Sequence, residues 1–479
     1  MRVQLWSRCP RNPLFLAFTF TDDAMTIPKT LAAATAVFAI GLIVAGFSND
    51  QRDIYVASAL AVFTIGFFAT GAVPAHIASI WFFIFAVVTQ IVPTEAIFSG
   101  FASMGFWMVF GGLLIGAAVR ETGLGRRIAG AMTAGFGRSY TGNIGGIVTV
   151  GVALAFFVPS TMGRVVILMP IVLELAENQG FESGSRGRDG FVIALLFGTL
   201  LPAFALLPSN LPNIILTGAA EALHGITLNY GEYLVLHFPL LGVLKAILII
   251  GLIVAMFSET PSREVPKRPR VPFSREERRL AVILGATLLL WMTDSLHGVA
   301  PGWIGLAAGS ACLLPGVGIL KADVVNKLNY EALLYVAGII GLGAMISTSG
   351  LGDRVGLFLL DVLGFSPGES MRNLGAMTGI SIVTGFLATQ AGVPAILTPI
   401  SGGIAEAMDL PLATVLMMQV LGFSSVVLPY QVPPLMVGLS LGGISVATAT
   451  RFSLTLFVPT VLILLPLDYF WWRILGYLP

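Results

Sequence analysis

The most constraining feature of this chain is a pair of apolar runs joined by a short polar stretch. Residues 144–158 and 165–173 are mostly apolar, and the stretch 159–164 between them reads Pro-Ser-Thr-Met-Gly-Arg. A helix needs about 20 apolar residues to cross a membrane, so neither run spans one alone. Together they predict a re-entrant helical hairpin over about 144–175. Its polar tip must lie against protein or a wet cavity, because lipid offers the backbone no hydrogen bonds.

The tip of this first hairpin has the chemistry of an anion site. The helix that restarts after the break directs its free N–H groups and its positive dipole end into any cavity at the tip. Ser160 and Thr161 add hydroxyl groups, and Arg164 adds a full positive charge. The alternative is structural: the hydroxyls cap the helix, and Arg164 donates to a backbone carbonyl.

A similar stretch occurs in the second half of the chain. Two short apolar arms, 373–387 and 395–404, flank the polar tip 388–394, which contains Thr389 and Gln390. This pattern predicts a second re-entrant hairpin over about 373–404. Two such tips, one in each half, are typical of transporters built from internal repeats.

The composition indicates that the rest of the chain is also embedded in lipid. Hydrophobic residues make up 56% of the chain and charged residues 11%, whereas soluble proteins carry about 25% charged residues. We therefore expect an all-α polytopic membrane protein. The net charge of +1 argues against a nucleic-acid partner. The sequence has no recognisable nucleophile–base set, phosphate loop or metal motif, so we expect neither an enzyme nor a cofactor.

Four apolar spans are expected before the first hairpin, at about 31–47, 54–72, 75–93 and 104–119. The connection 120–138 contains four arginines and one acidic residue, so the positive-inside rule places it in the cytoplasm. The span count then makes the N-terminus cytoplasmic, in a multi-pass protein of the cytoplasmic (inner) membrane. Residues 1–29 are interpreted as a tail, or in part as an extension before a true start at Met25.

A broken span follows the first hairpin. Apolar residues 191–206 lead to the segment 207–213, whose two prolines and two asparagines interrupt the helix before it resumes. The next span, 233–257, carries Lys245 near its middle, and we expect this lysine to face protein. It is either a coupling or gating charge, or the partner of an acidic group inside the bundle. Residues 258–279 carry seven basic residues and four glutamates, which predicts a cytoplasmic linker between the halves.

The second half repeats this plan with one span fewer before its hairpin. Its elements are expected as spans at 280–296, 298–316 and 330–348, the hairpin, a span at 413–427 broken over 428–434, and a last span at 452–472. The first repeat thus covers 30–257 and the second 280–479.

Matching landmarks relate the two repeats. The turn Thr-Gly-Leu-Gly-Arg-Arg at 122–127 matches Ser-Gly-Leu-Gly-Asp-Arg at 349–354. Nearly the same length of chain that separates these two turns also separates the tip residues Ser160 and Thr389. It also separates Pro212 and Pro434, the prolines of the two breaks. By the span count, the two turns face opposite sides of the membrane, so we expect inverted repeats.

In this order of elements the chain resembles the divalent anion/sodium symporter family, within the ion-transporter superfamily that also contains citrate and arsenite permeases. The resemblance covers nearly the whole chain from about residue 30. The family has a Ser-Asn-Thr motif at each tip. Here Thr161 stands in the asparagine position of the first tip, and Gln390 in that of the second. The family's asparagine in the first break is kept as Asn213, whereas Leu435 replaces it in the second break.

The resemblance implies a secondary active transporter of a small divalent anion, such as sulfate or a dicarboxylate, with sodium as the coupling ion. It also implies alternating access by an elevator-type motion in a homodimer. Expected substrate ligands are Ser160, Thr161, Arg164, Asn213, Thr389 and Gln390, and expected sodium ligands are Ser160, Thr161, Asn210, Thr389 and Gln390. Because both tip asparagines are replaced, proton coupling and exchange stay open as alternatives. A passive anion channel or a subunit of a membrane complex is the alternative from a different class.

Overall fold

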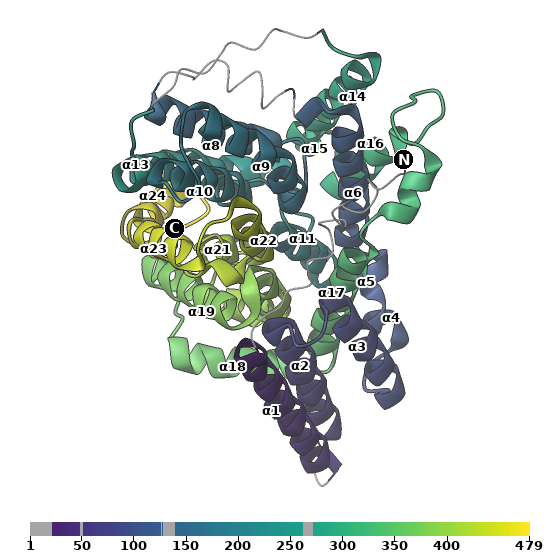
Figure 1. Ribbon diagram of the computed structural model, residues 1–479. Coiled ribbons are helices and arrows are strands. Elements are labelled where there is room, and N and C mark those ends of the chain that lie inside the picture. Colours follow the sequence, from purple (N-terminus) through teal and green to yellow (C-terminus); the bar gives the residue numbers. More distant parts are fainter. Residues whose placement is uncertain (1–21, 48–50, 126, 128–138, 262–271) are drawn as a thin grey trace, which may run out of the picture.

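The regular elements of this protein are helices. A computed structural model describes residues 22–47, 51–125, 127, 139–261 and 272–479, and it contains no strand in these ranges (Figure 1). Seven of the described helices are long and apolar enough to cross a membrane, and five shorter apolar helices accompany them. The prediction of an all-α polytopic membrane protein is therefore confirmed.

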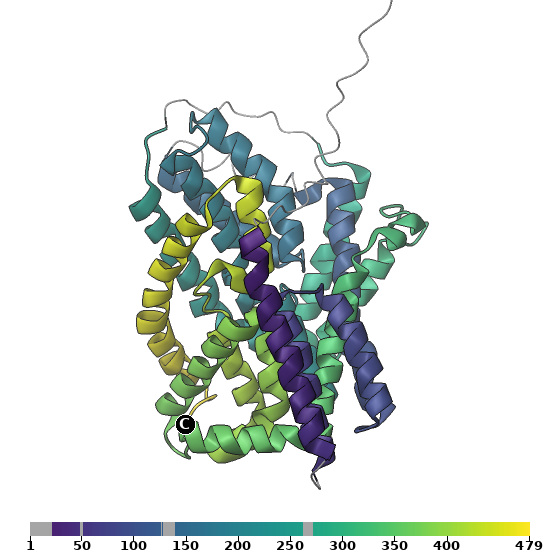
Figure 2. The ribbon, with the colours of Figure 1, turned by 60° about the horizontal axis from the view of Figure 1, so that its bottom comes forward.

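The first half begins with two helices that pack side by side, α1 (Asp22–Phe47) and α2 (Arg52–Thr70) (Figure 2). Its other elements are α3 (Ala75–Thr89), α4 (Thr94–Ile97), α5 (Ser99–Ala102), α6 (Met104–Thr122), α8 (Tyr140–Ala155), α9 (Thr161–Asn178), α10 (Arg186–Leu200), the 3₁₀ turn η2 (Pro202–Ala205), α11 (Leu211–His224), α12 (Tyr230–His237), the π-helical segment η3 (Phe238–Leu244) and α13 (Lys245–Phe257).

The second half has a similar order of elements. They are α14 (Arg275–Met292), α15 (Asp294–His297), α16 (Pro301–Ala311), η4 (Ala322–Lys327), α17 (Tyr330–Thr348), α18 (Leu351–Leu363), α19 (Ser370–Leu397), η5 (Thr398–Ile400), α20 (Ser401–Met408), α21 (Leu412–Phe423), η6 (Pro429–Gln431), α22 (Pro433–Gly442), α23 (Val446–Pro459), the π-helical segment η7 (Thr460–Leu464) and α24 (Leu465–Ile474).

Side-chain caps fix where many of these helices begin. A polar side chain at each start accepts a hydrogen bond from the backbone N–H three residues later, which satisfies one of the unpaired donors of a helix N-terminus. In the first half these caps are Ser103, Ser139, Ser160, Ser185 and Asn210, at the starts of α6, α8, α9, α10 and α11. The serine of the first hairpin tip is thus the start signal of α9.

The helices form two groups that sit side by side (Figure 1). We call α8–α10, α12, α13 and α19–α24 the hairpin group, because it contains both predicted hairpins. We call α3–α6 and α14–α17 the frame group. Helix α11 packs against both, since it contacts α19 of the hairpin group and α6 and α17 of the frame group. The two halves of the sequence are therefore interleaved.

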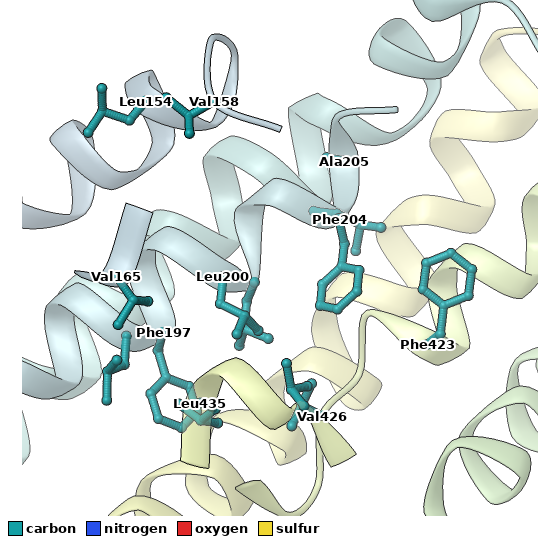
Figure 3. Close-up of a cluster of buried hydrophobic side chains, with 14 of the residues drawn as sticks. Leu154, Val158, Val165, Phe197, Leu200, Phe204, Ala205, Phe423, Val426 and Leu435 are labelled. Atoms are coloured by element: carbon teal, nitrogen blue, oxygen red, sulfur yellow. The ribbon is translucent and has the colours of Figure 1, made fainter. Parts of the chain in front are cut away.

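Apolar side chains from both broken spans meet inside the hairpin group (Figure 3). The rings of Phe204 in the first break and Phe423 at the end of α21 have centroids 5.7 Å apart. In this view Leu200 and Val426 lie beside these rings, and Val165 and Leu435 continue the cluster beside Phe197; all of them are almost fully buried. Burial of apolar side chains at this point holds the two interrupted spans against each other.

The π-helical segments give a landmark of the repeat that the sequence pattern did not reveal. η3 begins at Phe238 and η7 begins at Thr460, and the length of chain between these starts equals that between Pro212 and Pro434. Both segments interrupt the last long span of their half, and they contact each other. The order of elements therefore recurs, while the inverted orientation of the repeats stays a prediction.

Several boundaries differ from those expected from hydropathy. α1 begins at Asp22, inside the stretch 1–29 interpreted as a tail, because a helix can extend beyond its apolar run and keep its backbone paired. α16 ends at Ala311 rather than near 316, since the chain turns at Pro315 and Gly316. The short helices α4 and α5 were not expected at all. Parts of the connection 120–138 and of the linker 258–279 lie outside the described residues.

The described parts of these two basic segments lie together. Arg127 donates to both carboxylate oxygens of Glu277, at 2.7 and 2.8 Å, and to the carbonyl of Pro272 at 2.9 Å. Its guanidinium also lies 4.6 Å from the ring centroid of Phe273. The two segments are therefore on the same side of the helical bundle, as the positive-inside argument requires of two cytoplasmic connections.

Candidate functional site

The first predicted tip is a compact turn between α8 and α9. Ser160 occupies the N-cap position of α9, and its Oγ accepts a hydrogen bond of 3.1 Å from the N–H of Gly163. Thr161 follows as the first helical residue and is 8% exposed. The tip hydroxyls therefore lie where α9 presents its positive dipole end.

Arg164 is fully buried and binds backbone carbonyls. Its guanidinium donates to the carbonyls of Val158 in the tip at 2.5 Å and of Thr199 and Ser209 in the broken span at 3.2 and 3.0 Å. A fourth hydrogen bond of 3.2 Å goes to Oγ1 of Thr161. This is the structural alternative that the sequence left open: Arg164 ties the first tip to the first break.

The second predicted tip is a sharp kink rather than a loop. Within α19, Ala388 has φ −131° and ψ 18°, and Thr389 has φ 65° and ψ 168°. The conformation of Thr389 belongs to a region that is almost restricted to glycine and costs a non-glycine residue about 1–3 kcal/mol. Such strain persists only where the surrounding structure enforces it, and it is most common at functional sites.

Gln390 follows the kink with an unsatisfied amide group. Its side chain is 1% exposed, and neither its Oε1 nor its Nε2 has a hydrogen-bond partner among the described residues. Burial of a primary amide without hydrogen-bond partners costs folding free energy. A polar ligand at this position would supply the missing hydrogen bonds. The residue lies in the lining of a cavity, described below.

Both breaks are supported by polar side chains from within the hairpin group and α11. In the first break, Nδ2 of Asn213 donates to the carbonyls of Phe204 and Leu206 at 3.0 and 2.8 Å, and the hydroxyl of Tyr233 donates to Phe204 at 2.8 Å. In the second, Oε1 of Gln431 accepts from the N–H groups of Val427 and Leu428, both at 2.8 Å. Asn213 thus satisfies carbonyls freed by the unwinding.

A buried cation lies at the carbonyl end of the half-helix before each break. Arg164 donates to Thr199 in the last turn of α10, and Lys245 donates to the carbonyl of Ser424, the C-cap of α21, at 2.7 Å. These positions carry the negative ends of the two helix dipoles, which cations stabilise. The negative ends are thereby neutralised inside the protein.

The positive helix ends, in contrast, converge on one cavity of about 540 Å³. The starts of α9 and α11 line it, as does the arm of α19 that begins after the kink. The start of α22 lines it too, but its first residues, Pro433 and Pro434, carry no N–H, so it adds its dipole only. The described lining contains the carboxylate of Glu331 and no arginine or lysine.

The cavity gathers most of the predicted site residues. Ser160, Thr161, Asn210, Thr389 and Gln390 all line it. Arg164 and Asn213 are not in the lining; they lie behind it, bound to the carbonyls described above.

Sequence patterns missed the frame side of the cavity. His76 at the start of α3 lies 3.5 Å from Glu331 at the start of α17, and both line the cavity. Tyr335, one turn further along α17, also lines it, and its ring stacks edge-on against Phe68 with centroids 5.0 Å apart. The sequence pattern around these residues is weak. His76 follows Pro74 and Glu331 follows Asn329, each at the start of an apolar span.

Comparison with known proteins agrees with this geometry. The family profile described as sodium:sulfate symporter transmembrane region matches residues 26–478. A protein named membrane protein from Cupriavidus necator is 23% identical over 398 residues, covering 79% of this chain and 76% of the relative. Proteins named L-tartrate/succinate antiporter, from Shigella sonnei and from Escherichia coli strain K12, are each 24% identical over 354 residues, covering 70% of this chain and 72% of the relative.

The profile extends over nearly all of the chain, including both hairpins and both breaks. The family profile describes symporters, and the relatives from Shigella and Escherichia are named antiporters, so these proteins are transporters rather than enzymes. The resemblance inferred from the order of the motifs is therefore confirmed, and this chain belongs to the sodium:sulfate symporter family.

Proposed function

We propose that this protein is a secondary transporter that carries a small dicarboxylate across the cytoplasmic membrane by alternating access. The convergence of positive helix ends on the cavity is the observation that carries this proposal. Dipole ends and free N–H groups attract an anion without a neighbouring side-chain cation. The negative ends of α10 and α21 would repel an anion, but Arg164 and Lys245 bind the carbonyl groups there.

Two facing tips suit a substrate with two anionic groups. One carboxylate would lie at the first tip, at the hydroxyls of Ser160 and Thr161, and the other at the second tip, at Thr389 and the unpartnered amide of Gln390. The names of the relatives from Shigella and Escherichia support a C4-dicarboxylate over sulfate. Arg164 and Asn213 would act from behind, by holding the first tip and the first break in place.

Transport without sodium, either by exchange or with proton coupling, is the mode that we favour. A sodium site of the kind expected from the family needs several free oxygen ligands, yet Arg164 already occupies three carbonyls and the hydroxyl of Thr161. The relatives from Shigella and Escherichia are named antiporters. Sodium symport is the second candidate. It is supported by the family description and by the side-chain oxygens that remain in the lining, from Ser160, Asn210, Thr389 and Gln390.

The movement that exposes the site to alternate sides would shift the hairpin group against the frame group. On the frame side, residues of α3, α6 and α17 line the cavity. The elevator-type motion, the homodimer, and the cytoplasmic placement of the N-terminus and of the linker 258–279 remain predictions from the sequence.

Thermal unfolding of the purified protein tests the proposed substrate class. A ligand that binds only the folded state raises the melting temperature by mass action. Succinate and L-tartrate are expected to raise it in sodium chloride and equally in choline chloride, and sulfate is expected to raise it less. A rise seen with a dicarboxylate only when sodium is present would support symport instead. No rise with any dicarboxylate, while sulfate raises it, would contradict the proposed substrate.

A further inference from the structure

A second group of buried polar side chains lies away from the substrate cavity. Lys245 on α13 and Asp468 on α24 are each 1% exposed, and they come from the last long spans of the two halves. Lys245 donates to the carbonyl of Ser424. Oδ1 of Asp468 has no hydrogen-bond partner in the described part of the chain, and the ammonium of Lys245 is the charge that acts on this carboxyl group.

A small cavity opens directly beside Asp468. Its volume is about 10 Å³, which is room for about one water molecule. Besides Asp468, its polar lining consists of Thr378, Ser425 and Thr460, and the rest of the lining is aliphatic. The Oγ1 of Thr378 is buried without a partner among the described residues. The site thus offers two unsatisfied polar groups to a very small ligand.

The backbone around the pair is irregular in both halves. The π-helical segment η3 ends directly before Lys245, and η7 ends one helical turn before Asp468. The length of chain between the two charged residues is nearly that between Pro212 and Pro434, so the pair occupies nearly equivalent places in the two repeats. π-Helical segments are rare and are frequent at functional sites.

We propose that Asp468 and Lys245 form a proton-binding site that couples dicarboxylate movement to a pH gradient. A proton delivered by water forms an O–H bond with the carboxylate of Asp468, and no other bond breaks in the protein. The charge of the pair then changes from zero to plus one. Oδ1 of Asp468 has no hydrogen-bond donor among the described residues and lines a cavity of the size of one water molecule, so a proton carried by water has an acceptor there. Sodium is a poorer occupant, because it would bring a second cation next to the ammonium of Lys245.

The site is connected to the substrate cavity through the second break. Lys245 holds the carbonyl of Ser424, where α21 ends, and the unwound segment continues from there to Gln431 and Val432. Both of these residues line the substrate cavity. Loss of the negative charge on Asp468 frees Lys245 to interact more strongly with this carbonyl. Protonation therefore acts on the same segment that faces the anion.

No other charged group competes with Asp468 for this role among the described residues on the surrounding helices. His237 on the neighbouring helix α12 is a buried titratable side chain, and its ring lies 5.6 Å from that of Trp472, one turn beyond Asp468. Tyr233 and Tyr469 are the nearby phenols. The remaining titratable groups on the helices packed against the pair are exposed or lie at helix ends: Tyr140, Arg186, Arg188, Asp189, Tyr230, Glu232, Arg372, Arg451 and Arg473.

The test compares two transport assays of the full chain in proteoliposomes, and it rests on the proposed function. Counterflow of labelled succinate at equal pH measures substrate exchange alone. Uptake driven by an acidic exterior, without internal substrate, measures proton coupling. Wild type is expected to perform both. Asp468→Asn is expected to retain counterflow within about twofold and to lose at least about tenfold of the pH-driven uptake. Asp409→Asn, an exposed acid at a helix end, is the matched control and should retain both.

A second variant keeps the test decisive if Asp468→Asn fails to fold. Lys245→Met/Asp468→Asn removes both charges, so no buried charge is left unpaired. Because Lys245 also neutralises the negative end of α21, counterflow is expected to fall in this variant. The readout is therefore the ratio of pH-driven uptake to counterflow, which should fall at least about tenfold below that of wild type. Failure of counterflow in wild type would contradict the proposed function. Three outcomes with intact counterflow would overturn the proton site alone. They are the absence of pH-driven uptake in wild type, its survival in these variants, and uptake that requires sodium instead of a pH gradient.

Discussion

Arg164 illustrates how a charged residue inside a membrane protein can serve the site without lining it. Its position beside the first tip suggested contact with the substrate. The structure instead gives its guanidinium four acceptors, three of them backbone carbonyls that the tip and the break leave without a helical partner. A planar fork with five donors is suited to this task, whereas an ammonium group has three donors on one atom.

Replacement of Arg164 by lysine should therefore destabilise the protein although the charge is kept. Each buried acceptor that loses its donor costs about 1–3 kcal/mol, so the midpoint of thermal unfolding in detergent should fall clearly. The matched control is Arg188→Lys, at an arginine that pairs with the exposed carboxylate of Glu177. An exposed pair of this kind contributes about 0–1 kcal/mol. Equal midpoints for the two variants would contradict the tie assigned to Arg164.

Thr389 allows strain and chemistry to be separated. Its positive φ costs about 1–3 kcal/mol, which glycine would not incur, although glycine loses about 0.5–1 kcal/mol through chain entropy. Thr389→Gly is thus expected to raise the unfolding midpoint slightly and to lower succinate transport, because the hydroxyl is removed. Thr389→Ser keeps both the strain and the hydroxyl and should transport normally. Normal transport by Thr389→Gly would remove this residue from the binding site.

At the scale of elements, the start of α14 offers a test by pH. The hydrogen bonds from Arg127 lower the pKa of the Glu277 carboxyl below its ordinary value. A carboxyl group whose pKa is lower in the folded state contributes stability above its unfolded pKa and loses it as the pH falls through the folded pKa.

Glu277→Gln should therefore lower the unfolding midpoint at neutral pH, and the difference from wild type should disappear in acid, below the lowered pKa of Glu277. Unfolding followed by fluorescence over a pH series measures this. Glu369→Gln, at an exposed glutamate directly before α19, is the control. If the difference in unfolding midpoint between Glu277→Gln and wild type stayed the same in acid, the contribution of Glu277 would not come from its charge interaction with Arg127.

The elements also show which parts of the fold are readable from the sequence. The hairpins and broken spans were predicted because proline, asparagine and small polar residues interrupt apolar runs in a membrane. The second tip was predicted at the right place, but its form, a kink of two residues at Ala388 and Thr389, was not, because it is fixed by packing around the tip. The π-helical segments η3 and η7 leave no mark in hydropathy.

For the site, the sequence identified the polar groups and not their directions. Ser160, Thr161, Asn210, Thr389 and Gln390 line the cavity as their positions at helix starts suggested. The directions of Arg164 and Asn213 depend on which carbonyls the breaks leave open, and these carbonyls are set by tertiary structure. The frame side was missed because residues at span ends, such as His76 and Glu331, usually face water.

At the scale of the whole molecule, alternating access requires the hairpin group to move against α6. A Cβ placed on Gly112 of α6 lies 3.4 Å from that of Pro159 at the first tip, close to the roughly 3.5–4.5 Å typical of a disulfide. We expect oxidation of Gly112→Cys/Pro159→Cys, in a background without Cys9 and Cys312, to stop transport and reduction to restore it.

The matched control joins two helices within the hairpin group. A Cβ placed on Gly442 of α22 lies 3.4 Å from that of Val192 on α10. Gly442→Cys/Val192→Cys should transport when oxidised, because no movement between the groups is blocked. Full transport by the completely cross-linked Gly112/Pro159 variant would rule out a movement of this tip relative to α6.

The measurement that tests the central claim most directly is counterflow of labelled succinate into proteoliposomes loaded with unlabelled succinate, without sodium. Wild type is expected to accumulate label transiently. Gln390→Leu, which replaces the unpartnered amide in the cavity by an apolar group of similar size, is expected to abolish accumulation while retaining the wild-type unfolding midpoint. Undiminished counterflow by Gln390→Leu, or no counterflow of any dicarboxylate by wild type, would contradict a dicarboxylate site between the two tips.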